Sequence, residues 1–237
     1  MTAPVRDLND PGQYDDLVAQ WWDPAGRFAM LQWIARSRAA LLPPPPGDRR
    51  GVLVDVACGG GLLAPHVDPR WAHIGVDVGA GATRIARAHG VTAVQGDALA
   101  LPLAAGSADV VVAGEVLEHV SDVDRAVAEV CRVLKPGGTV VIDTIARTRF
   151  ARFAAVTVAE RAPGGPPRRL HDPALFVDRR RLVASFADHG VTLSLHGLVP
   201  DPVGYARWLL DRTRSVRLRR VPSTAALFAG VGRKAAA

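Results

Sequence analysis

The sequence predicts an α/β fold in which helices cover both faces of a doubly wound parallel sheet. Apolar runs alternate with amphipathic segments through much of the 237-residue chain, as is typical of such sheets. The first apolar run, residues 52–57, leads into the glycine cluster 59–61, and the second, residues 72–76, is followed by Asp77. A glycine loop lets the backbone approach a ligand, and an acid about twenty residues later is placed to bind ribose hydroxyls. We therefore expect a nucleoside at the carboxyl ends of two neighbouring strands.

Helical periodicity opens the chain. Residues 11–42 place apolar side chains on helical faces, and Asp23-Pro24-Ala25-Gly26 divides them into two predicted helices before the stiff proline linker 43–46. The strands predicted after this linker are residues 52–57, 72–77, 91–95, 109–113, 138–144, 191–198 and 224–232. The helices predicted between them are residues 61–67, 80–89, 122–134, 178–189 and 202–211. Lys135-Pro136-Gly137-Gly138 is expected to be a turn that ends a helix and starts a strand.

Residues 146–173 interrupt this alternation with arginines, scattered apolar residues and the run Pro163-Gly164-Gly165-Pro166-Pro167. We expect a short amphipathic helix and a mobile loop, inserted over the active-site end of the sheet. Residues 1–237 are predicted to form a single domain, with a helical cap and linker over 1–46 and a lid or membrane-facing insertion over 146–173.

Composition favours a cytoplasmic protein. Hydrophobic residues make up 49% of the chain, yet no apolar run reaches the ~18 residues of a membrane span. The N-terminus has no apolar signal core. The two cysteines, Cys58 and Cys131, do not suggest a disulfide framework, which agrees with a reducing compartment.

Positive charge is concentrated late in the chain. Residues 1–146 carry 12 basic and 17 acidic side chains, whereas residues 147–220 carry 15 basic and 6 acidic ones. A solvated arginine-rich surface is the favoured interpretation, and an anionic partner is the alternative. Nucleic acid is not expected, because no aromatic residues alternate with the arginines at stacking spacing and no binding motif is present.

The residues of the glycine loop narrow the choice of nucleoside. Their pattern is Asp-x-Ala-x-Gly-x-Gly over residues 55–61, which lacks the G-x-G-x-x-G spacing of dinucleotide sites. The third predicted strand ends in Gln95-Gly96-Asp97-Ala98, which places a carboxylate where an adenine amino group could be held. This ordered series resembles the class I S-adenosylmethionine-dependent methyltransferases, and the resemblance implies a Rossmann-like sheet of seven strands with the last one antiparallel. Ala57 departs from the glycine that is commoner in that class.

The segment after the fourth predicted strand carries candidate acceptor-site residues. If residues 115–119 form one helical turn, Glu115, Glu118 and His119 share a face at positions i, i+3 and i+4. Two carboxylates and an imidazole make a candidate site for a divalent cation, which would bind adjacent acceptor hydroxyls and lower their pKa. The alternative is that Glu118 and His119 only begin a surface helix.

A narrower resemblance extends over nearly the whole chain. The segments that carry it are Tyr14 to Arg38 with Gln20-Trp21-Trp22-Asp23-Pro24, Asp55 to Gly61, Glu115-Val116-Leu117-Glu118-His119-Val120, Leu134-Lys135-Pro136-Gly137-Gly138, Thr144-Ile145-Ala146-Arg147-Thr148 and Leu170-His171-Asp172. They resemble the ubiquinone-biosynthesis O-methyltransferase family, whose members methylate a hydroxyl of a polyprenylated catechol or demethylated quinol. The family uses a divalent metal on the Glu-x-x-Glu-His element, and it has a membrane-associating insertion that corresponds to residues 146–170 here. The resemblance implies donor contacts at Arg38 (on the methionine carboxylate), Ala57, Asp77 and Gly114. We also expect the donor to be bound by Asp55 and Gly59 of the glycine loop, and by Asp97 and Ala98 at the adenine.

The sequence therefore predicts an S-adenosylmethionine-dependent O-methyltransferase acting on a phenolic, catecholic or hydroquinone small molecule, with Mg²⁺ or a similar ion at Glu115, Glu118 and His119. Residues 146–170 and 199–222 depart from the family, so a phenolic or catecholic specialised metabolite is an equal acceptor candidate. A metal-free N- or C-methyltransferase is the alternative, with His119 or His171 as the base.

Three further side chains have two interpretations each. His171, beside Asp172, is either a base or acceptor contact in the lid, or one half of a loop-fixing pair. Trp21 and Trp22 either stack on the acceptor or pack between helices, and packing is favoured for at least one of them.

The insertion 146–170 is also a candidate for peripheral contact with an anionic membrane at its inner face.

Overall fold

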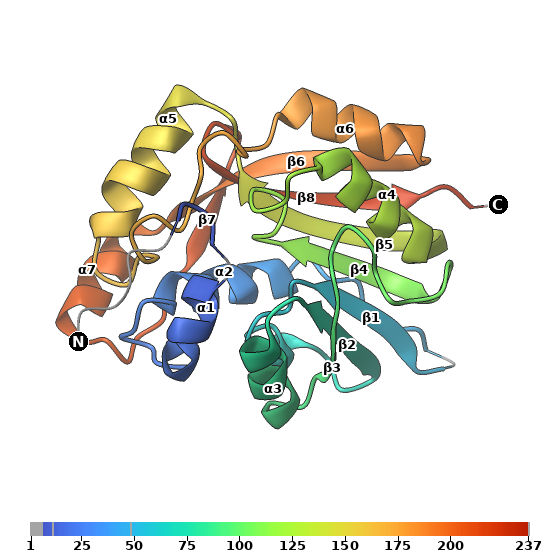
Figure 1. The fold of residues 1–237 in the computed structure, drawn as a ribbon, viewed down its shortest axis with the longest axis horizontal. Helices are drawn as coiled ribbons and strands as arrows, with labels where there is room; N and C mark the ends of the chain where they lie inside the picture. The colour runs from blue at the N-terminus through green and yellow to red at the C-terminus, as the bar shows by residue number, and fades with distance from the viewer. Residues whose placement is uncertain (1–6, 11, 48, 237) are drawn as a thin grey trace.

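Eight strands build one continuous sheet in a computed structural model that describes residues 7–10, 12–47 and 49–236. The strands are β1 (Gly51–Val56), β2 (Trp71–Asp77), β3 (Thr92–Gln95), β4 (Ala108–Gly114), β5 (Leu134–Ile145), β6 (Val191–Pro200), β7 (Leu218–Val221) and β8 (Leu227–Lys234). Their order is β3-β2-β1-β4-β5-β8-β6-β7. The first five strands are parallel, and β8 runs antiparallel between β5 and β6. The predicted α/β fold with an antiparallel final strand is confirmed (Figure 1).

Helices lie on both faces of this sheet (Figure 1). They are α1 (Gly12–Asp16), α2 (Ala29–Ala39), α3 (Ala80–Ala88), α4 (Val123–Val133), α5 (Arg149–Arg152), α6 (Arg179–Asp188) and α7 (Pro202–Leu210). Alternate residues of β1 explain the two layers, because successive side chains of a strand point to opposite faces. Val54 packs in the cluster that holds α4 and α6, whereas Leu53 packs with residues that follow α2.

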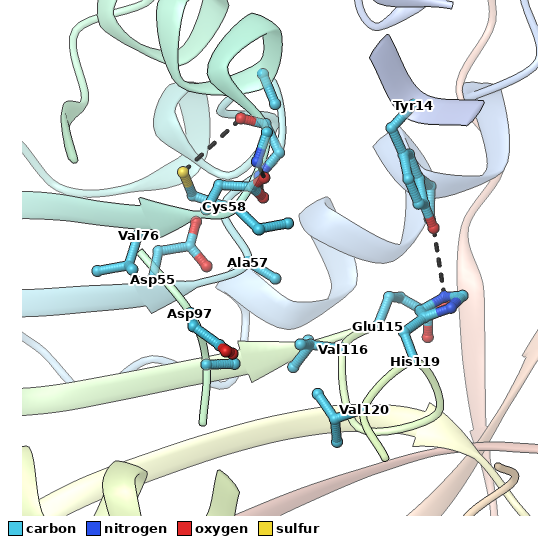
Figure 2. A pocket seen from close by; sticks show the side chains of 18 of the residues that line it. Tyr14, Asp55, Ala57, Cys58, Val76, Asp97, Glu115, Val116, His119 and Val120 are labelled. Atoms are coloured by element: carbon cyan, nitrogen blue, oxygen red, sulfur yellow. Dashed lines mark hydrogen bonds between the residues drawn. The ribbon is translucent and has the colours of Figure 1, made fainter. Parts of the chain in front are cut away.

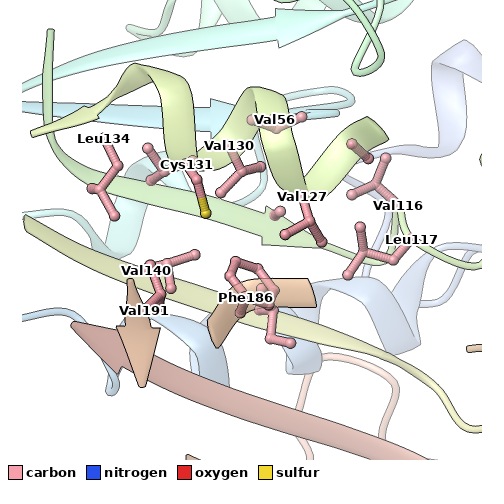
Figure 3. Close-up of a cluster of buried hydrophobic side chains, with 14 of the residues drawn as sticks. Val56, Val116, Leu117, Val127, Val130, Cys131, Leu134, Val140, Phe186 and Val191 are labelled. Carbon is pink, nitrogen blue, oxygen red and sulfur yellow. The ribbon is translucent and has the colours of Figure 1, made fainter. Parts of the chain in front are cut away.

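The larger core lies between the sheet and the helices α4 and α6. Figure 3 shows Val127 and Val130 of α4 facing Val140 of β5 and Phe186 of α6. The amphipathic pattern of α4 produces this contact, and Asp122 fixes where the helix begins by accepting a hydrogen bond from the Arg125 amide at 3.0 Å. This core packs against β4 and β5, whose carboxyl ends lead into the loops of the site.

The sheet has eight strands rather than the seven predicted. The additional strand, β7, lies at the sheet edge and pairs antiparallel with β6. It contains the exposed Arg219 and Arg220, and because of this charged pair the strand lacks the apolar run that predicts the other strands.

Three local predictions are also corrected. The helix predicted over 61–67 is only a 3-10 turn, Ala64–His66, because Gly61 has a left-handed φ of 80° and Pro65 lacks an amide donor. The predicted turn 135–138 lies inside β5, as an irregularity in its pairing with β4. The first predicted N-terminal helix is reduced to α1 and the 3-10 turn Val18–Gln20, and residues 1–6 and 11 of the predicted cap lie outside the described residues.

The insertion after β5 begins with the predicted short helix, α5, which continues as the π-helical segment Phe153–Val158 and the 3-10 turn Ala159–Arg161. The loop that follows contacts α7, because the Tyr205 hydroxyl donates to the Pro163 carbonyl at 3.1 Å. Among the described residues, no helix has the length and apolar character needed to span a bilayer.

Candidate active site

A cavity of about 460 Å³ opens at the carboxyl ends of β1, β2 and β4 (Figure 2). Its floor comes from the loops after these strands, and its far wall comes from the N-terminal segment that carries Tyr14 and Trp21. The sequence-predicted site residues on its wall are Arg38, Asp55, Ala57, Gly59, Asp77, Asp97, Ala98, Gly114, Glu115 and His119. This is the strand-end position expected for a nucleoside site in an open α/β sheet.

The glycine loop after β1 lines the cavity and packs closely against the indole ring of Trp21. A Cβ atom on Gly59 would lie 2.5 Å from Trp21, and one on Gly60 would lie 2.8 Å from it. Trp22 holds the same loop from a second side, because its Nε1 donates to the Gly60 carbonyl at 3.0 Å. Both tryptophans therefore pack on the loop, and of the two only Trp21 also lines the cavity.

Ala57, where the class more often has glycine, keeps a backbone conformation typical of glycine. Its φ is 56°, in the left-handed region that normally favours glycine. The chain therefore keeps the backbone path of a glycine loop while placing a methyl group on the cavity wall.

Asp77 joins two loops at the centre of the site. Its Oδ2 accepts from the Gly59 amide and its Oδ1 from the Gly79 amide, each at 2.8 Å. These bonds fix the carboxylate beside the glycine loop, where the prediction places ribose hydroxyls. Asp97 lies exposed at the outer end of the cavity, with its Oδ1 accepting from the Leu99 amide at 2.8 Å.

Arg38 reaches the cavity from α2 and forms a buried ion pair with Asp143 of β5. Its Nε donates to Oδ2 at 2.5 Å and its Nη2 to Oδ1 at 2.6 Å. The guanidinium covers Gly114, since a Cβ there would lie 2.0 Å from Arg38 Cζ. The nearby charge of Asp143 raises the pKa of Arg38 despite its burial.

His119 lies across the cavity from Asp55 and Cys58, below Tyr14 in Figure 2. Asn9 Nδ2 donates to the His119 carbonyl at 2.9 Å, so Asn9 Oδ1 faces the ring and accepts from Nδ1–H. The Nε2 lone pair is then left to accept from the Tyr14 hydroxyl at 3.3 Å. Burial, with a smaller effect of His171, lowers the pKa of His119 to about 3 and keeps the imidazole neutral.

The predicted helical turn over 115–119 is wrong. Glu115 has a left-handed φ of 53°, and residues 116–119 form a turn closed by the His119 amide and the Val116 carbonyl at 2.9 Å. Glu118 points away from the cavity, is fully buried and accepts from Thr144 Oγ1 at 2.7 Å. Within the described part of the chain, no three His, Cys, Asp or Glu side chains are grouped to hold a metal ion, so Glu115, Glu118 and His119 do not fit the predicted site as they are arranged.

His171 lies behind the cavity wall rather than on it. It is 5% exposed, stacks on His119 with ring centroids 5.5 Å apart, and lies 3.3 Å from Glu160 Oε1 through its Nδ1. Sequence patterns did not single out Glu160, Asn9 or Asp143, because each meets its partner through the tertiary fold. For Asp143 a signal was available, because an acid interrupts the run Val140-Val141-Ile142-Asp143.

Comparison with known proteins gives this site a family. A model described as a methyltransferase domain matches residues 54–142. The ubiquinone biosynthesis O-methyltransferase of Methylobacterium nodulans is 30% identical over 235 residues, covering 91% of this chain and 94% of that protein. The protein of the same name from Ralstonia nicotianae is 35% identical over 222 residues, covering 87% and 92%. This chain belongs to the ubiquinone biosynthesis O-methyltransferase family.

The chain is accordingly a class I S-adenosylmethionine-dependent O-methyltransferase, as the resemblance implied. Solved structures agree on the fold. A Thermotoga maritima methyltransferase, described as a possible histamine N-methyltransferase, superimposes with a TM-score of 0.67 at 21% identity over 94% of this chain and 97% of that one. A Mesorhizobium loti methyltransferase gives 0.58 at 20% identity over 84% and 96%.

Proposed function

We propose that this O-methyltransferase acts on a phenolic, catecholic or hydroquinone small molecule and that His119 removes the hydroxyl proton. The observation that carries the proposal is the orientation of His119, whose Nε2 lone pair lies on the wall of the cavity that also contains the glycine loop. The relatives are named for ubiquinone biosynthesis, which supports an aromatic hydroxyl acceptor.

The donor half of the proposal assigns S-adenosylmethionine to the strand-end side of the cavity. The sulfonium supplies an activated methyl group. Asp77 faces the ribose position, Asp97 and Ala98 the adenine position, and Arg38 the methionine carboxylate. Asp55 is buried beside this end of the cavity, 3.4 Å from His73 Nε2. The remaining predicted donor contacts are Ala57, Gly59 and Gly114.

The acceptor half assigns the apolar wall near Val116, Val120 and Leu175 to an aromatic ring. An acceptor hydroxyl that takes the place of the Tyr14 hydroxyl donates to His119 Nε2. As the oxygen bonds to the methyl carbon, the carbon–sulfur bond breaks and the hydroxyl proton moves to Nε2. Because burial weakens this base, proton transfer accompanies methyl transfer rather than preceding it.

No step is assigned to a metal ion. The carboxylate of Glu118 is held by Thr144 outside the cavity, so it is not grouped with Glu115 and His119 around one position. The observed arrangement therefore supports a base mechanism on a hydroxyl acceptor.

The experiment that tests this proposal supplies purified protein with labelled S-adenosylmethionine and a matched series of catechol, hydroquinone and aniline acceptors. We expect labelled methyl ethers, and we expect His119→Gln to lower kcat by about 10²- to 10⁴-fold. Exhaustive chelation should leave the rate unchanged. Methylated aniline as the main product, or full activity of His119→Gln, would contradict the proposal.

We also propose that the insertion contacts an anionic membrane. Phe150 and Phe153 are 60% and 56% exposed, and Arg149 and Arg152 flank them on the same short segment. Apolar side chains beside arginines suit the interface of an anionic bilayer. Vesicles containing phosphatidylglycerol should co-sediment the protein, phosphatidylcholine vesicles should not, and replacing both phenylalanines with serine should abolish the difference. Equal recovery with both vesicle types would remove the proposal.

A further inference from the structure

We propose that Asp143 is a positioning residue for the methyl donor: it holds the Arg38 guanidinium over Gly114, so that the free edge of Arg38 binds the methionine carboxylate. This inference rests on the donor assignment of the proposed function and adds to it a residue that lies outside the cavity lining.

The ion pair has a geometry that leaves one edge of the guanidinium for a ligand. Asp143 binds Nε and Nη2 together, and its own side chain is 1% exposed. Nη1 of Arg38 has no hydrogen-bond partner among the described residues, although the side chain lines the cavity. Arginine has five N–H donors in a rigid fork, so fixing one edge sets the direction of the remaining donors.

Gly114 shows how tightly this orientation is held. A Cβ atom at this position would lie 2.0 Å from Cζ and 2.1 Å from Nε of Arg38. The guanidinium therefore lies flat against the end of β4, with Asp143 on the neighbouring strand β5. The glycine that the sequence assigned to the donor site is required by the arginine that covers it.

The charges around Arg38 suit an amino-acid zwitterion. Asp55 and Glu115 also line the cavity, and both are close enough to raise the pKa of Arg38. A methionine moiety that turns its carboxylate toward Arg38 can turn its ammonium toward these acids. Asp143, which is already neutralised by Arg38, does not repel the incoming carboxylate as a lone acid would.

A purely structural role for the pair is the competing explanation, because the ion pair also ties α2 to β5. Binding measurements on two ligands separate the two roles. S-adenosylhomocysteine carries the carboxylate, and its decarboxylated analogue keeps the adenosine and the amino group but lacks it. If Asp143 positions Arg38, its loss weakens binding of S-adenosylhomocysteine only. If the pair only stabilises the fold, its loss weakens binding of both ligands.

The experiment measures both dissociation constants by calorimetry, with thermal unfolding of each protein alongside. Asp143→Asn should raise the dissociation constant of S-adenosylhomocysteine by about tenfold or more. It should change the dissociation constant of the decarboxylated analogue by less than twofold. Gly114→Ala, which displaces Arg38 directly, should give the same selective loss and serves if Asp143→Asn does not fold. Asp109→Asn is the matched control, because Asp109 also binds an arginine, Arg49, through both its oxygens but lies away from the cavity.

Equal weakening of both ligands by Asp143→Asn and Gly114→Ala, or no weakening, overturns the inference. These outcomes are independent of the acceptor, so the inference can fail while aromatic hydroxyl methylation holds. Failure of wild-type protein to prefer S-adenosylhomocysteine over its decarboxylated analogue would instead remove the assignment of Arg38 in the proposed function.

Discussion

Replacing Gly60 with alanine tests whether Trp21 shapes the donor loop. The new Cβ would lie 2.8 Å from Cγ, 2.9 Å from Cδ2 and 3.0 Å from Cβ of Trp21. Favourable carbon contacts are about 3.5–4.0 Å, so the indole must move by roughly 0.5–1 Å. These atoms are at the base of the side chain, and the ring also stacks on Phe28 at 4.5 Å, so a rotation alone does not relieve the contact.

We expect Gly60→Ala to lower the free energy of unfolding by about 1–3 kcal/mol, as overpacking of a filled site does. The measurement is urea unfolding, with S-adenosylhomocysteine binding measured on the same protein. Gly47→Ala is the control, because its Cβ would meet nothing within 4 Å. In a Trp21→Ala background the cost of Gly60→Ala should fall sharply. An equal cost in both backgrounds, or a cost no larger than that of Gly47→Ala, would show that Trp21 does not shape the loop.

Three more predictions concern stability. Burial raises the pKa of Glu118 to about 7. The neutral carboxyl therefore stabilises the fold fully below the unfolded pKa near 4.5, and this contribution is lost as the pH rises through 7. Glu118→Gln should flatten the resulting fall in Tm between pH 5 and 8. Ala57→Gly removes a left-handed strain of about 1–2 kcal/mol and adds an entropic cost of about 0.5–1 kcal/mol, so urea unfolding should show a small net gain. Trp208→Ala, which removes a fully buried indole bonded to the Pro24 carbonyl, should cost about 3–5 kcal/mol by the same assay.

Local sequence was sufficient to predict the cavity at the strand ends. The apolar run of β1, the glycines after it and the acid ending β2 are neighbours both in sequence and in space, so their spacing alone predicted the cavity that the fold forms. The antiparallel position of β8 came with the family resemblance. In contrast, the charged edge strand β7 carries too few apolar residues to be recognised without its partner β6.

The contacts that fix the side chains around the cavity could not be predicted because they are long-range. Asn9 meets His119 across 110 positions, and Arg38 meets Asp143 across 105. The spacing of Glu115, Glu118 and His119 was compatible with a helix, but the backbone is left-handed at Glu115, and only Glu115 and His119 line the cavity while Glu118 points away from it. A spacing pattern contains no information on such a backbone reversal when the residue is not glycine.

The N-terminal segment couples the binding of the two substrates through its two contacts. Trp21 packs on the glycine loop, which we assign to the donor, and Tyr14, only seven positions earlier, contacts His119, which we assign to the acceptor. In the proposed mechanism the acceptor hydroxyl displaces Tyr14 from His119, which loosens this short segment and raises the entropy lost when the donor orders the Trp21 end. The two substrates should therefore bind with negative cooperativity, and thermodynamic reciprocity requires each to weaken the binding of the other by the same factor.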